Sequence, residues 1–237
     1  MAIRFDANGD YLTRTTSLPG ASYPLTVSMW IWFAAAPTDE GFFTIGAGTW
    51  FYAYANSSSE WGLDTPGMSA ANGSIAATTW YWVTLVVNDA NSSVALSVDG
   101  SVVVSGSPGT SFTPTDLQIG EPGASFMNGR HAHFKMWTAG LTAAELAQER
   151  YSARPRRSAN LHLWSPLFKN TKDYSGNARD WTENGTLAYE DGPPVGWGAA
   201  PLIVGGSSGA PAGPDYGTPY DHDGVKPFSS LWRAGRM

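Results

Sequence analysis

Residues 116–151 read DLQIGEPGASFMNGRHAHFKMWTAGLTAAELAQERY, and this stretch decides the fold. A short apolar strand is predicted at 117–120, and a polar loop with glycines follows it. Residues 131–137 then alternate in polarity, which predicts a strand with one face on a core. The face expected to meet the core carries Ala132, Phe134 and Met136, and the other face carries His131, His133, Lys135 and Trp137.

A short helix is expected directly after this strand. The chain turns at Ala139-Gly140, and Thr142 is followed three residues later by Glu145. This spacing is typical of a capping box, in which each residue satisfies a backbone N–H at the start of the helix.

Other segments also favour β-structure with tight turns. Residues 25–33 (LTVSMWIWF) are apolar on nearly both faces, so they predict a central strand. Residues 79–87 (TWYWVTLVV) predict a second long strand. Asn8-Gly9 and Asp99-Gly100 are turn signals between strands. Together these segments predict an all-β antiparallel fold with one short helix.

Composition limits the classes of partner. The chain has 237 residues, 42% hydrophobic residues, 14% charged residues, no cysteine and a formal net charge of −6. This charge disfavours nucleic acid as a ligand, because binding to phosphates needs a basic surface. Apolar runs of the roughly 20 residues needed to span a bilayer are absent from the sequence, so no membrane insertion is expected. The first residues read as a strand and not as a signal peptide, so we expect synthesis in the cytoplasm.

The order of motifs around the quoted stretch resembles a known family. The matching residues follow the pattern "l-x-i-G … f-x-G-x-i-d-x-v-r-i-w-x-x-x-L-s-x-x-E-i" of laminin-G-like, pentraxin-type domains in the concanavalin A-like lectin/glucanase superfamily. They are Ile119-Gly120, Phe126, Gly129, Phe134, Met136-Trp137, Leu141-Thr142 and Glu145-Leu146. The resemblance implies an antiparallel jelly-roll β-sandwich, which we expect to occupy residues 1–191. One fold carries many functions, so the resemblance indicates fold better than activity.

Residues 192–237 differ in character from the rest of the chain. They are rich in glycine and proline and lack periodicity, which predicts an extended C-terminal arm and not a second domain. Aromatic and apolar anchors between flexible linkers suit a segment that binds a partner. The anchors expected to dock on a neighbouring subunit are Trp197, Tyr216, Tyr220, Phe228, Leu231 and Trp232. The alternative is an arm that folds back over its own sandwich.

The aromatic residues around 50–61 are the candidate glycan site. Trp50, Tyr52 and Tyr54 share one face of a predicted strand, and Trp61 follows. Aromatic rings offer an apolar face on which a sugar ring can stack. The alternative is that these rings belong to the core, as alternating aromatic residues in a sandwich usually do.

The resemblance also implies calcium as a candidate cofactor. Calcium takes about six to eight oxygen ligands. By resemblance the candidates are Asp6, Asn8, Asp10 and Asn128. The family often has an aspartate two to three residues after its glycine, whereas this chain has His131-Ala132 there, which weakens the case. Turn chemistry is the alternative role for these residues, because Asn and Asp cap their own backbone.

Three classes of function follow from these features. The first is a non-enzymatic decoration or appendage subunit of a phage-like particle, located at the virion surface and contacting capsid, tail or identical subunits. The second is a carbohydrate-binding module for surface adhesion. The third is a glycoside hydrolase, which is disfavoured because the paired-carboxylate motif E-x-D-x-x-E of glucanases with this fold is absent. We therefore expect a protein that is not an enzyme.

Overall fold

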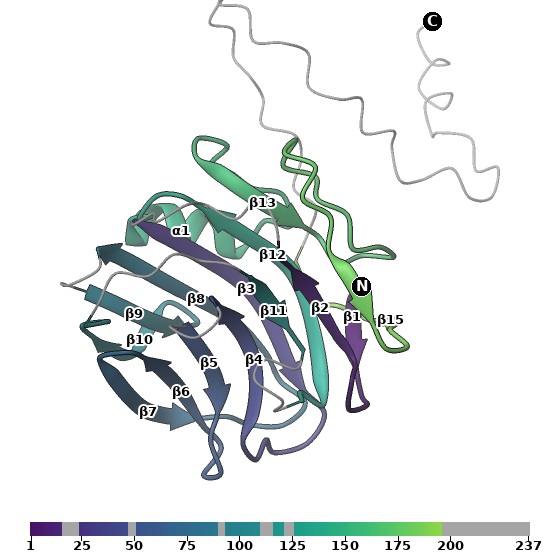
Figure 1. Cartoon of the computed structure of the whole chain (residues 1–237), viewed down its shortest axis with the longest axis horizontal. Helices are drawn as coiled ribbons and strands as arrows, with labels where there is room; N and C mark the ends of the chain where they lie inside the picture. Colours follow the sequence, from purple (N-terminus) through teal and green to yellow (C-terminus); the bar gives the residue numbers. More distant parts are fainter. Residues whose placement is uncertain (16–23, 47–50, 90–92, 110–115, 121–125, 196–237) are drawn as a thin grey trace, which may run out of the picture. The chain divides into compact units, whose positions relative to one another are not determined.

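The computed structural model describes residues 1–15, 24–46, 51–89, 93–109, 116–120 and 126–195. In these residues two antiparallel sheets face one another, and a single short helix accompanies them (Figure 1). The predicted all-β sandwich with one short helix is therefore confirmed. Within the described ranges, no helix has the length and hydropathy needed to cross a membrane.

The first sheet has eight strands in the order β10-β9-β8-β3-β12-β1-β15, and β13 also pairs with β12. The strands are β1 (Ala2–Phe5), β3 (Leu25–Phe33), β8 (Trp80–Asp89), β9 (Ser93–Val98), β10 (Ser101–Gly106), β12 (Gly129–Trp137), β13 (Leu161–Ser165) and β15 (Ala188–Glu190). The two longest apolar runs in the sequence, β3 and β8, lie next to one another inside this sheet. Both are rich in β-branched and aromatic residues, which fit a pleated and buried surface.

The second sheet has seven strands in the order β14-β2-β11-β4-β5-β6-β7. They are β2 (Tyr11–Arg14), β4 (Glu40–Ile45), β5 (Phe51–Ala55), β6 (Glu60–Thr65), β7 (Met68–Ser74), β11 (Leu117–Ile119) and β14 (Thr182–Asn184). Neighbours along the sheet are often distant in sequence, since β11 lies between β2 and β4. The outward face of this sheet therefore combines side chains from most of the chain.

The core lies between the two sheets. Phe5, Phe33 and Phe134 from the first sheet meet Phe43 and Phe51 from the second, and all five side chains are buried. Burying one large apolar side chain stabilises the fold by about 1.5–3 kcal/mol. A core of this kind is expected to hold the sandwich together without disulfides.

Strand β12 departs from the simple alternation that its sequence predicts. His133 has a φ of 54°, and the pairing with β3 shifts between Ala132 and Lys135. This bulge adds a residue and exchanges the faces on its two sides. Phe134 faces the core as predicted. The prediction was wrong for the residues before the bulge: Ala132 packs outside with Trp30 and Trp82, and His131 packs inside against Phe5.

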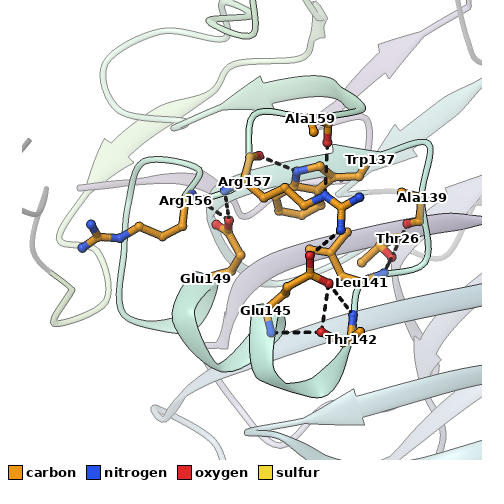
Figure 2. Close-up of polar contacts among 10 residues, drawn as sticks. All are labelled: Thr26, Trp137, Ala139, Leu141, Thr142, Glu145, Glu149, Arg156, Arg157 and Ala159. Atoms are coloured by element: carbon orange, nitrogen blue, oxygen red, sulfur yellow. Dashed lines mark hydrogen bonds and ion pairs between the residues drawn. The ribbon is translucent and has the colours of Figure 1, made fainter. Parts of the chain in front are cut away.

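Helix α1 (Ala143–Arg150) begins as predicted. The Thr142 side chain accepts a hydrogen bond from the Glu145 backbone N–H, and Glu145 accepts one from the Thr142 backbone, so the capping box is confirmed (Figure 2). Leu146 packs against Trp30 and Trp82 on the outer face of the first sheet. The helix is thereby fixed beside β12, β3 and β8 (Figure 1).

Hydrogen bonds join the loop before α1 and the loop after it to the eight-stranded sheet. Thr26 on β3 donates to the Ala139 carbonyl at 2.7 Å and accepts from the Leu141 backbone N–H at 3.0 Å (Figure 2). The indole N–H of Trp137 donates to the Arg157 carbonyl at 2.9 Å. These bonds fix the helix through buried or half-buried partners on both sides.

The first residues of the predicted arm remain packed on the sandwich. Val195 packs against the cluster of Trp30, Trp82 and Ala132. Residue 196 and those after it, including all six predicted docking anchors from Trp197 to Trp232, lie outside the described residues. Docking by the arm therefore stays a prediction.

Candidate functional site

Tyr52 and Tyr54 on β5 point away from the core. Their neighbours Phe51, Ala53 and Ala55 are buried, while the two tyrosines are only half-buried. Because side chains on a strand alternate between faces, both tyrosines lie on the outward face of the seven-stranded sheet. Their ring centroids are 5.1 Å apart and their planes differ by 13°. They form a stacked pair on the outward face, which is the kind of surface that a sugar ring can cover.

The other two members of the predicted glycan cluster do not join this pair. Trp61 is 1% exposed and packs against Phe33, Phe42 and Tyr81 in the core. It lies opposite Ala55, an inward-facing residue, so the register of β5 and β6 turns it inward. Its assignment as a glycan contact was wrong. Trp50 lies outside the described residues.

The ring of Tyr54 lies over Gly62. A Cβ atom at position 62 would come within 2.4 Å of the Tyr54 ring, so only glycine leaves room for it. The Tyr54 hydroxyl donates to Asp64 Oδ1 at 3.2 Å. Burial raises the pKa of Tyr54, and the nearby Asp64 carboxylate raises it further, while a hydrogen bond with Ser69 lowers it. The Tyr54 hydroxyl therefore stays protonated, and it donates its hydrogen bond to Asp64 on β6.

The residues that pair across the sheet with Tyr52 form a continuous polar row. Directly opposed residues in antiparallel strands share a face, so the register of the seven strands defines which side chains lie side by side. In order from β14 to β7 the row is Thr182, Thr13, Gln118, Thr44, Tyr52, Asp64 and Ser69. We call this set the outer row. It carries hydroxyl, amide and carboxylate groups, which can donate to or accept from sugar hydroxyls.

A bulge in β4 determines which side chain lies next to the tyrosine pair on the outward face of the sheet. The pairing of β4 with β5 shifts between Gly41 and Phe43. The shift lets Phe42 and Phe43 both turn into the core, where both are buried. Gly41 is therefore the residue of β4 that pairs with Tyr54, so no large side chain of β4 lies beside the Tyr54 ring at this position.

Three of the four candidate calcium ligands are engaged in other contacts. Asp10 is buried, and its carboxylate accepts hydrogen bonds from the backbone N–H groups of Asp6, Ala7 and Thr186. Asn8 is exposed. This pattern is turn chemistry, which was the alternative considered for these residues.

Arg4 contacts the remaining two candidates. Its Nη2 donates to Asn128 Oδ1 at 3.0 Å, and its Nε lies 3.7 Å from Asp6 Oδ2. A guanidinium between these oxygens repels a divalent cation. The residues present do not fit a calcium site. In the described parts of the chain, no group of three or more His, Cys, Asp or Glu side chains is placed to hold a metal ion.

The carboxyl group of Glu40 on β4 has a raised pKa. Burial raises its pKa, while hydrogen bonds from the backbone of Asn128 and Thr38 lower it. Its Oε2 accepts the Asn128 N–H at 3.1 Å, which joins β4 to the start of β12. The contact explains Glu40 as a structural residue.

A groove runs between α1 and the outer face of the eight-stranded sheet. Its volume is about 370 Å³, and its lining includes Thr84, Ser97, Val102, Leu146 and Tyr151. Tyr151 is 68% exposed and Val102 is 60% exposed. This groove is a second place where an aromatic ring meets solvent, and it lies on the opposite sheet from the tyrosine pair.

The sequence profile of the family described as the concanavalin A-like lectin/glucanases superfamily matches residues 6–147. A search of curated proteins finds no significant match.

Two solved structures have similar folds. A protein from Bacteroides ovatus ATCC 8483, provisionally described as carbohydrate binding, is 15% identical with a TM-score of 0.63; the match covers 83% of this chain but 61% of that protein. The heptameric SAP-like pentraxin of Limulus polyphemus is 14% identical with a TM-score of 0.56, covering 79% of this chain and 93% of the pentraxin. At these identities the likeness shows a lectin-like jelly-roll fold.

Proposed function

The chain belongs to the concanavalin A-like lectin/glucanases superfamily, and from that premise we propose that it is a non-catalytic carbohydrate-binding protein. The proposed site is the outer face of the seven-stranded sheet, centred on Tyr52 and Tyr54. The observation that carries the proposal is the stacked pair of tyrosines within a row of hydrogen-bonding side chains. The description of the Bacteroides ovatus protein as carbohydrate binding supports the same class of ligand.

The chemistry of the face suits a sugar better than a purely apolar ligand. A sugar presents an apolar ring face and a rim of hydroxyl groups. The tyrosine pair matches the ring face, and the half-buried Gln118 and Asp64 on the same face match the hydroxyls. Tyr54 is already oriented by Gly62 and Asp64, so little ordering is needed on binding.

The test is binding of the purified full chain to an array of plant, fungal and bacterial polysaccharides. Tyr52→Ala and Tyr54→Ala should each lose most of the binding seen for the wild type, because each removes half of the stacked pair. Tyr151→Ala is the matched control, since it removes an exposed tyrosine from the groove beside α1. Binding that survives both β5 variants but is lost in Tyr151→Ala would place the site in the groove and contradict this proposal.

The proposal that the protein is not an enzyme is tested on the same ligands. Each polysaccharide that binds is incubated with the protein, and new reducing ends are measured. We expect none, because the sequence lacks the paired-carboxylate motif of glucanases. Turnover that disappears when one glutamate is replaced would overturn this part of the proposal.

We further propose that the protein is a decoration or appendage subunit of a phage-like particle, exposed at the virion surface. The specific support is the sequence of residues 192–237, in which aromatic anchors such as Trp197 and Trp232 are separated by glycine and proline. Deleting residues 198–237 should leave a folded sandwich that no longer associates with its protein partner, measured by sedimentation of the assembly. A truncated protein that unfolds, or one that assembles normally, would contradict docking by the arm.

A further inference from the structure

The face that carries the tyrosine pair is built from a part of the chain without cationic side chains. Residues 15–129 contain no lysine, arginine or histidine, although they contain eight aspartates and glutamates. Strands β4, β5, β6, β7 and β11 all come from this stretch, and they are neighbours in the seven-stranded sheet. The tertiary structure therefore gathers a cation-free sequence into one continuous surface.

The outer row shows the same bias at the level of side chains. Its seven members include one charged residue, the acidic Asp64, and no lysine or arginine. The nearest cationic residue along the sheet is Arg14 at the end of β2, whose guanidinium donates to the Asp180 carbonyl at 2.9 Å. The internal segments outside the described ranges also carry no lysine or arginine, so they cannot add a positive charge to this face.

Asp64 lies where a bound sugar would meet it. It pairs directly with Tyr52, and its carboxylate accepts the hydroxyl of Tyr54 at 3.2 Å. A carboxylate can accept several hydrogen bonds, so the one from Tyr54 leaves acceptor capacity for a sugar hydroxyl. Glu60 adds a second carboxylate on the same strand, where its Oε2 accepts from Asn56 at 2.9 Å.

We propose that this face binds uncharged glycans and excludes acidic ones, and that Asp64 sets the preference. The proposal rests on the carbohydrate-binding function proposed above and names the class of ligand for that site. A sugar hydroxyl donates a charge-assisted hydrogen bond to the Asp64 carboxylate. A uronate, sialate or sulfate group on the same glycan meets a carboxylate at close range, and within the described residues the outer row supplies no cation to compensate. Like charges repel strongly where water is displaced.

The experiment compares each neutral polysaccharide that binds on the array with its own carboxymethylated derivative. The pair shares a backbone and differs in the added carboxymethyl groups, and the salt dependence of binding separates the charge of these groups from their bulk. At low salt we expect the derivative to bind about tenfold more weakly or worse, as one unfavourable charge contact implies. Raising the salt concentration should narrow the difference, because the Debye length falls from about 30 Å at 0.01 M to about 10 Å at 0.1 M.

Asp64→Asn is the decisive variant. Asparagine keeps an oxygen that can accept the Tyr54 hydroxyl, so the site keeps its shape while it loses the charge. We expect the variant to bind the carboxymethylated ligand several-fold better relative to the neutral one, and Asp64→Asn with Glu60→Gln to remove most of the remaining difference. Glu190→Gln is the matched control, because it removes one negative charge from β15 on the other sheet and should leave the preference unchanged.

The outcomes separate this inference from the function on which it rests. If no ligand binds in a manner that depends on Tyr52 and Tyr54, the proposed function fails. If binding depends on both tyrosines but carboxymethylated or sialylated ligands bind as well as neutral ones at low salt, the function stands and the charge preference is wrong. A preference that is unchanged in Asp64→Asn would likewise overturn the role of Asp64.

Discussion

The Nζ atom of Lys135 lies 2.7 Å from Oε2 of Glu149, and both side chains are 1% exposed. The ammonium also donates to the Ser152 carbonyl at 2.7 Å. Glu149 Oε1 accepts the backbone N–H groups of Arg156 and Arg157 (Figure 2). One buried ion pair thus joins β12, the end of α1 and the loop that follows. Burial lowers the pKa of Lys135, and the Glu149 carboxylate raises it.

Lys135→Met should destabilise the protein by about 3–5 kcal/mol, because it leaves the Glu149 carboxylate buried without its cation. Adding Glu149→Gln should recover part of the loss, since the amide is neutral and still accepts a backbone hydrogen bond. The measurement is urea unfolding. Lys172→Met is the control: its pair with Asp180 is exposed to solvent, so we expect the free energy of unfolding to change little. Equal effects in the two lysine variants would contradict the importance of burial.

Stability should fall as the pH decreases below about 6.5, because burial holds the pKa of two histidines well below its ordinary value. Burial lowers the pKa of His131 to about 3, and it lowers the pKa of His133 to about 3 with a smaller effect of Lys135. In the unfolded chain both histidines bind a proton near pH 6.5, whereas the folded protein keeps them neutral down to about pH 3. Protons therefore favour unfolding by up to about 1.4 kcal/mol per pH unit for each histidine.

His131→Leu should remove about half of this pH dependence between pH 7 and pH 5, a range above the ordinary titration of carboxylates. The free energy of unfolding is measured at several pH values for both proteins. A slope that is the same in wild type and variant would show that His131 does not titrate as its burial predicts.

Gly62→Ala should displace the Tyr54 ring and weaken glycan binding. The added methyl group would lie 2.4 Å from a ring atom, so the ring must move and its hydrogen bond to Asp64 must break or lengthen. We expect a loss of about 1–3 kcal/mol in stability, typical of overpacking. In a Tyr54→Ala background the same substitution should cost much less, as a double-mutant cycle would measure. Additive effects would contradict contact between the two positions.

Calcium should have little effect on thermal stability. A ligand that binds the folded state raises the melting temperature according to its concentration and affinity. Here Asp10 is hydrogen bonded to three backbone N–H groups, and Arg4 lies between Asp6 and Asn128. A rise of several degrees in millimolar calcium, reversed by a chelator, would contradict this prediction.

Local sequence determined the elements and their turns. Residues 25–33 form β3 as predicted, because their apolar, aromatic and β-branched side chains favour a buried strand. Asp99 and Gly100 both have positive φ values in the hairpin between β9 and β10, which is what their residue types favour. The capping box of Thr142 and Glu145 depends on residues three apart, so it too could be read directly. The concanavalin A-like fold follows from the order of such signals.

Tertiary structure decided which side chains face outward. Whether Trp61 joins Tyr54 or the core depends on the register of β5 and β6, and pairing with Ala55 turns it inward. A shift of one residue would exchange the faces, and the aromatic composition alone does not fix that register. The bulge at His133 likewise exchanges His131 and Ala132 between faces. The outer row joins residues from 13 to 182, which are adjacent only because strand order differs from chain order.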